Sequence, residues 1–145
     1  MKMRAAVLEE FGRPLVVQEL DLADPKAGEV LVRLCACGVC HTDMYTASGV
    51  DPSGYVPTVL GHEGAGVVEA IGPDVTSVKP GRRIAGSSFG GVKGREQVPQ
   101  LIERYLAGEI DVDPFISHRI TLDEVNTGFE LMHVQEGIRS VIEFS

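Results

Sequence analysis

Two short segments of the sequence carry side chains that could bind a metal ion. Cys40 lies in GVCHTD, residues 38–43, and His62 lies in GHE, residues 61–63. A thiolate together with an imidazole suits Zn²⁺ better than Mg²⁺ or Ca²⁺, which prefer oxygen ligands. Because the two residues are far apart in the sequence, only the fold can bring them together.

Two carboxylates accompany this pair. Glu63 directly follows His62, and Asp43 lies about one helical turn beyond Cys40. Either carboxylate could coordinate the metal, or could hold the imidazole by accepting its other N–H. A lone cysteine and a lone histidine are also common in protein cores, where free cysteine packs well. Spacing alone therefore leaves a purely structural role open for both.

The three cysteines allow another interpretation, a site with only sulfur ligands, because they lie together in CACGVC, residues 35–40. This alternative is less favoured, since Cys35 and Cys37 fall within an apolar strand pattern whereas Cys40 follows a glycine turn. Three clustered cysteines cannot form a paired disulfide framework, so we expect a reducing, cytoplasmic environment.

Strands are the elements that must position these residues in the first part of the chain. Clusters of β-branched and leucine residues predict strands, with a short helix or turn after Cys40. The expected strands are 3–8, 14–20, 29–37 and 64–71.

The pattern changes after Gly81. Apolar residues at helical spacing predict a helix with Pro99 in its first turn and Gly108 at its end. A second helix is expected to begin at Thr121, with Glu124 as its capping partner. The sequence therefore predicts a mainly β, α+β fold with two helices near the C-terminus.

Length and charge limit the class of protein. The 145 residues suit one domain with one hydrophobic core. A formal net charge of −8 disfavours nucleic acid and anionic membranes as partners, because an acidic surface offers them no counter-charge. No apolar run approaches the length of a membrane span, and the apolar patch near the N-terminus is too short for a signal peptide. We expect no nucleic acid and no membrane among its partners.

The chain resembles the medium-chain zinc-dependent alcohol dehydrogenases, nearest their glutathione-type formaldehyde dehydrogenase branch. The resemblance lies in GEVLVRLCACGVCHTD (28–43), GHEGAGVVEAIG (61–72) and residues 89–144. It implies a single GroES-like β-barrel catalytic domain over 1–145, in which 1–80 form the N-terminal barrel part and 81–145 the C-terminal segment. The Rossmann domain of the family is missing, so we expect an internal deletion at or just before Gly81, either engineered or from natural truncation.

The resemblance also implies roles at the metal site. Cys40 and His62 match two of the three protein ligands of a catalytic zinc, and Glu63 matches the carboxylate beside them. Asp43 matches the residue that orients the histidine, and Thr42 matches the hydroxyl that binds the substrate alcohol and starts a proton relay. Because the third ligand of the family is missing, we expect Glu63 or Asp43 to complete the zinc site.

Two further residues match cofactor contacts of the family. His41 and Arg139 correspond to basic residues on the pyrophosphate of NAD, although either could equally be a solvated charge. Glycine-rich residues 64–69 and 90–94 lack the context of a dinucleotide loop. NAD binding is therefore expected to be weak or absent.

Three functions remain open from the sequence. The first is a truncated oxidoreductase acting on a small-molecule alcohol or aldehyde, with weak or altered activity. The second is a non-enzymatic GroES-like scaffold, and the third is a zinc-dependent hydrolase. Residues 82–88 could replace a deleted barrel strand, or could remain an exposed edge and pair with a second copy to form a homodimer.

Overall fold

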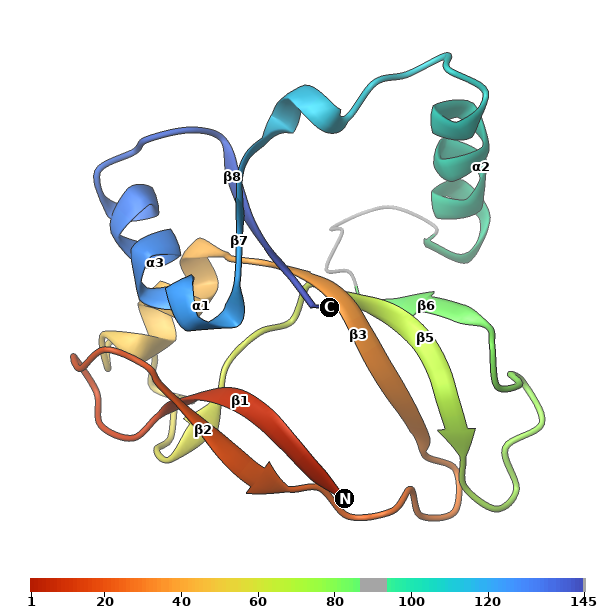
Figure 1. Ribbon diagram of the computed structural model, residues 1–145, viewed down its shortest axis with the longest axis horizontal. Coiled ribbons are helices and arrows are strands. Elements are labelled where there is room, and N and C mark those ends of the chain that lie inside the picture. The colour runs from red at the N-terminus through yellow and green to blue at the C-terminus, as the bar shows by residue number, and fades with distance from the viewer. Residues whose placement is uncertain (87–93, 145) are drawn as a thin grey trace.

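The computed structural model describes residues 1–86 and 94–144 and contains two β-sheets (Figure 1). The smaller sheet has the order β2-β1-β4, with both strand pairs antiparallel. Its strands are β1 (Lys2–Leu8), β2 (Val16–Asp21) and β4 (Thr58–Val59).

The larger sheet has the order β6-β5-β3-β8-β7. Its pairs are antiparallel except β7 and β8, which run parallel with helix α3 between them. This is the one parallel pair among the described strands, so the described residues contain no Rossmann domain, as expected. The strands are β3 (Val30–Gly38), β5 (Gly64–Ile71), β6 (Arg83–Ala85), β7 (Ile116–Ile120) and β8 (Arg139–Glu143).

Three α-helices complete the described fold, which is mainly β with α as predicted. Helices α1 and α3 lie close together beside the sheets, whereas α2 stands apart from them (Figure 1). Two short 3-10 helices, Asp113–Phe115 and Leu122–Glu124, lie before β7 and before α3. The α-helices are α1 (His41–Ala47), α2 (Gly94–Leu106) and α3 (Val125–His133).

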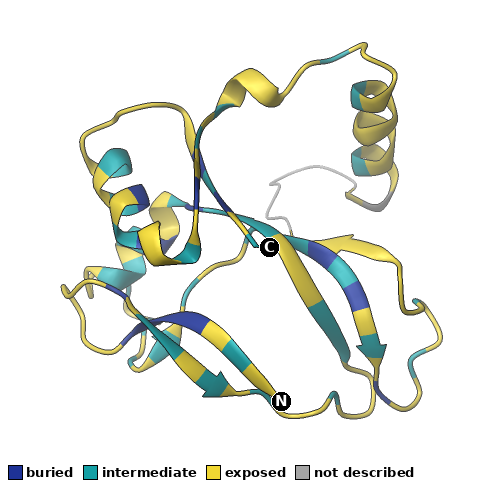
Figure 2. Ribbon diagram, in the orientation of Figure 1, coloured by how far each residue is buried: buried dark blue, intermediate teal, exposed yellow. Residues whose placement is uncertain are grey.

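The core is formed where β1, β8 and α3 meet. Leu8 is fully buried there, and Val125 and Ile142 are almost so. Phe129 and Met132, both on α3, pack against this cluster. The capping box predicted at Thr121 is also present. Dark blue segments in Figure 2 mark the buried residues.

Helix α2 differs from its prediction in two respects. It begins at Gly94, which places Pro99 in its interior rather than in its first turn. Proline has no N–H, so the carbonyl four residues earlier loses its helical hydrogen bond. This loss is tolerated because the helix is largely exposed and water can bind that carbonyl. Its apolar residues Leu101, Ile102 and Leu106 are also exposed rather than buried (Figure 2). Gly108, at a φ of +73°, ends the helix as predicted.

Strand β6 pairs antiparallel with β5 and lies at the edge of the larger sheet. It is shorter than the predicted strand at 82–88, of which residues 87 and 88 lie outside the described residues, as do 90–93 of the glycine-rich stretch. No helix among the described residues has the length and apolar character needed to cross a membrane.

Candidate metal centre

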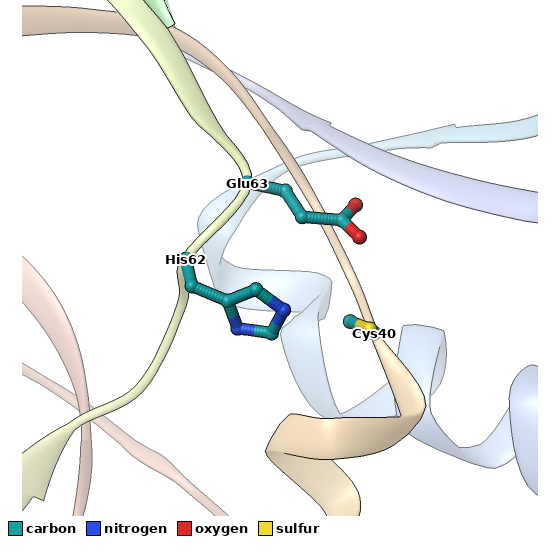
Figure 3. A group of neighbouring side chains, drawn as sticks. All are labelled: Cys40, His62 and Glu63. Carbon is teal, nitrogen blue, oxygen red and sulfur yellow. The ribbon is translucent and has the colours of Figure 1, made fainter. Parts of the chain in front are cut away.

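Cys40, His62 and Glu63 come together at one end of the larger sheet (Figure 3). Their Sγ, ring nitrogen and carboxylate oxygen all lie within 4.8 Å of one another. Cys40 is the residue that caps the N-terminus of α1, and the other two lie on the chain just before β5. The fold therefore joins the two segments that the sequence singled out.

Antiparallel pairing of β3 with β5 causes this convergence. Cys37 lies opposite Gly64 in the register, so the residues that follow β3 meet those that precede β5. The Gly38 N–H donates to the Glu63 carbonyl at 3.4 Å and extends this pairing. Cys40 then has an extended backbone, with φ −120° and ψ 150°, before the chain enters α1.

Gly38 leaves the space that the Glu63 side chain occupies. A Cβ atom at this glycine would lie 2.1 Å from Glu63 Oε2, which is far too close for any contact. Any larger residue here would force the Glu63 carboxylate to move away from its present position. The sequence marked Gly38 only as a turn residue, and nothing in the pattern indicated this steric role.

Asp43 lies behind the imidazole rather than among the candidate metal ligands. Its buried carboxylate accepts hydrogen bonds from Cys40 N at 3.2 Å and Gly61 N at 3.1 Å, and Oδ1 lies 3.2 Å from His62 Nδ1. A carboxylate at Nδ1 favours the tautomer with the proton on that atom, which leaves a lone pair on Nε2. Of the two roles considered for Asp43, this geometry favours orienting the histidine.

The Thr42 hydroxyl lies between the two main candidate ligands. Its Oγ1 is 3.2 Å from Cys40 Sγ and 3.0 Å from His62 Nε2. One hydroxyl hydrogen can be donated to only one of these atoms at a time. Thr42 therefore adjoins both atoms that a metal ion would bind.

Hydrogen bonding shifts the pKa values of both residues toward their charged forms. Partial burial opposes ionisation of Cys40, but hydrogen bonds from Thr42 and His62 outweigh it and lower the pKa of the thiol. Desolvation likewise opposes protonation of His62, yet contact with Cys40 and the charge of Asp43 raise the pKa of the imidazole. A thiolate is the form of cysteine that binds metal, so the Cys40 shift favours a ligand role.

Arg139 links the candidate metal centre to a neighbouring hollow. Its Nη1 donates to Glu63 Oε2 at 3.2 Å and to the Val39 carbonyl at 3.2 Å. Arg139 and His41 also line the same hollow of about 230 Å³, together with Glu136. The structure thus brings the two predicted cofactor residues together, although Arg139 already pairs with a carboxylate. Sequence reasoning missed that pairing.

Comparison with known proteins identifies the family. Residues 26–109, more than half of the chain, match the alcohol dehydrogenase GroES-like domain. The chain therefore belongs to this family, and the resemblance to zinc-dependent alcohol dehydrogenases is confirmed.

Individual relatives agree with this assignment. Over 84 residues, 58% of the chain, it is 60% identical to S-(hydroxymethyl)glutathione dehydrogenase of Paracoccus denitrificans. It is 58% identical to alcohol dehydrogenase class-3 of Cereibacter sphaeroides over the same length. These matches span only 22% of each relative.

Solved structures show the same fold. Benzyl alcohol dehydrogenase from Acinetobacter calcoaceticus has a TM-score of 0.56 and 35% identity, over 67% of this chain and 27% of that one. A putative zinc-binding dehydrogenase from Sinorhizobium meliloti 1021, bound to NADP, has a TM-score of 0.55 and 34% identity, over 67% and 29%.

Proposed function

We propose that this chain binds zinc through Cys40, His62 and Glu63 and acts on a small alcohol or aldehyde as a reduced form of a dehydrogenase catalytic domain. The observation that carries the proposal is the convergence of sulfur, nitrogen and oxygen donors from two distant segments, with Asp43 holding the histidine from behind.

The donor set fits zinc. A tetrahedral ion with bonds of about 2.0–2.3 Å needs ligand atoms about 3.3–3.8 Å apart, and the three atoms here require only small shifts to reach this spacing. The His62 side chain is 38% exposed, so the site has an open side for substrate or water. When bound there, zinc would act as a Lewis acid that lowers the pKa of an alcohol.

The chain's own residues would position the substrate and move its proton. With His62 Nε2 engaged by a metal ion, the Thr42 hydroxyl would lose that partner; it could then take up the proton of a substrate hydroxyl while releasing its own proton to solvent. Oxidation of an alcohol to an aldehyde transfers a hydride to nicotinamide and releases this proton to solvent. His41 and Arg139, at one hollow beside the site, are the residues proposed to hold the cofactor's phosphates, weakly in the absence of a nucleotide-binding domain.

Zinc content tests the metal site. Elemental analysis after dialysis is expected to find about one zinc per wild-type chain and a large loss in Cys40→Ser. Cys35→Ser is the matched control, because this exposed thiol lies in the same segment and outside the cluster. Equal zinc in wild type and Cys40→Ser would rule the site out.

Turnover separates the possible activities. A reduced dehydrogenase requires alcohol-dependent NADH formation that disappears in Cys40→Ser and His62→Ala. The exposure of His62 also favours a second candidate, a zinc hydrolase, for which hydrolysis of an activated ester should follow zinc content. A folded, zinc-loaded protein with neither activity would be a scaffold.

The three free thiols favour a cytoplasmic location.

A further inference from the structure

A second pocket, which is open to solvent on one side, lies between the two sheets and α3 and has a volume of about 280 Å³. It is distinct from the candidate metal centre, because neither Cys40, His62 nor Glu63 lines it, although Asp43 and Gly61 form part of its wall. Its lining includes Ala6, Leu34, Cys37, Val125, Phe129 and Phe144.

The charged residues of this wall are already paired. All three hydrogen bonds of the Asp43 carboxylate go to Cys40, Gly61 and His62. Arg4 donates to the carboxylate of Asp123. The Cys37 thiol donates to the Gly38 carbonyl at 3.5 Å. The described lining therefore offers a ligand no free charge.

The size of the cavity indicates that it can hold a molecule. Protein interiors are close-packed, with few voids larger than a water molecule. An enclosed apolar cavity of about 150 Å³ has room for benzene, so the volume here is sufficient for a ligand of at least that size. Water gains few hydrogen bonds from walls of alanine, leucine, valine and phenylalanine, so an apolar guest has little to displace.

We propose that this cavity is a binding site for a small, neutral, apolar molecule of the size of a substituted benzene or a branched aliphatic chain. The ligand contacts the aromatic rings of Phe129 and Phe144 and covers the Cys37 thiol. Neither zinc nor a nicotinamide cofactor is needed for this binding.

Alkylation of Cys37 tests the proposal on the wild-type protein. The rate of iodoacetamide modification is followed by mass spectrometry at Cys37, and at the exposed Cys35 as an internal control. With toluene at about ten times its Kd, about nine-tenths of the sites are filled, and the rate at Cys37 should fall about tenfold. The rate at Cys35 should not change, and glycerol, which is polar, should protect neither thiol.

A larger side chain that fills the pocket provides a second test of ligand binding. Ala6→Leu adds three carbons to a lining residue and should abolish protection by toluene. Ala47→Leu, which packs against the same core but does not line the cavity, should retain it. Cys40→Ser should also retain it, so this proposal and the zinc proposal can fail separately.

Three results would overturn the assignment. The first is an unchanged rate at Cys37 in saturating toluene. The second is equal slowing of Cys35, which would indicate a general effect of the solvent. The third is protection of Cys37 by raised protein concentration alone, which would make a second copy of the chain the occupant.

Discussion

Asp43 shows how one buried side chain sets the geometry of a candidate ligand. Because its carboxylate fixes the His62 ring through Nδ1, Asp43→Asn should weaken zinc binding about 10–100-fold without removing any ligand. Competition with a chromophoric chelator measures this affinity. Asp51→Asn is the control, since that carboxylate also accepts hydrogen bonds, from Thr46 and Ser53, but in a separate loop. An unchanged affinity in Asp43→Asn would contradict the orienting role.

Gly38 makes a second prediction at the scale of single residues. A methyl group at this position would occupy the place of Glu63 Oε2, so Gly38→Ala should displace the carboxylate. We expect zinc affinity to fall about tenfold, to the level of Glu63→Gln, and the two substitutions together to cost no more than either alone. Gly94→Ala serves as control, because nothing lies within 4 Å of its added Cβ. Additive losses would show that Gly38 does not act through Glu63.

The start of α3 predicts a dependence of stability on pH. Hydrogen bonds from the Thr121 backbone and hydroxyl lower the pKa of Glu124 below its ordinary value of 4.5. A lowered folded-state pKa adds stability above the unfolded pKa, and this is lost as pH falls through the folded pKa. Urea unfolding of wild type and Glu124→Gln should therefore give different stabilities at pH 6, and the difference should shrink as the pH falls below 4.5.

Two leucines on different elements differ greatly in solvent exposure. Leu8 on β1 is 0% exposed and Leu106 on α2 is 75% exposed. Leu8→Ala should cost about 2–5 kcal/mol of unfolding free energy, and Leu106→Ala close to zero, in the same denaturant titration. A similar loss at both positions would mean that α2 packs against the body in solution.

Local sequence patterns predicted most helices and strands, because the formation of these elements depends largely on residues that are close in the sequence. Leucine and β-branched clusters predicted β3 and β5, and Thr121 with Glu124 predicted the start of the C-terminal helix. Periodicity also found the apolar face of α2, but not its exposure, because exposure depends on what lies beside the helix. The parallel pairing of β7 with β8 is likewise a long-range contact that no local pattern contains.

The candidate site was likewise predictable in its residues but not in their contacts. The residue types of Cys40 and His62 were compatible with zinc but left a structural role open, and the family resemblance then favoured the zinc site with Asp43 and Glu63 beside it. The choice between coordinating and orienting roles for Asp43 required the fold, since it depends on which ring nitrogen faces the carboxylate. The ion pair of Glu63 with Arg139 joins residues 76 positions apart and had no signal in the sequence.

At the scale of the whole molecule, the larger sheet joins the early and late parts of the chain. Strand β3 pairs with β5 on one side and with β8 on the other, so the metal-site strands and the C-terminal segment share one sheet. On the far side of β5, β6 occupies the edge. The position of β6 is compatible with both predicted alternatives. It extends the sheet, as a replacement for a deleted barrel strand would, and its outer side faces no other described strand, as an edge that pairs with a second copy requires.

The unpaired outer edge of β6 leads us to expect self-association of the chain. A two-fold axis at Ile84, which is 38% exposed, would place each Ile84 against its copy and each Arg83 opposite Ala85, so that no arginines face one another. We expect a monomer–dimer equilibrium in sedimentation velocity, with a dissociation constant raised about tenfold or more, about 1.4 kcal/mol, by Ile84→Lys. Val50→Lys, at another exposed apolar position, adds the same charge and should leave the equilibrium unchanged. A monomer at every accessible concentration would mean that this edge, although unpaired within the described chain, is too short to hold a partner.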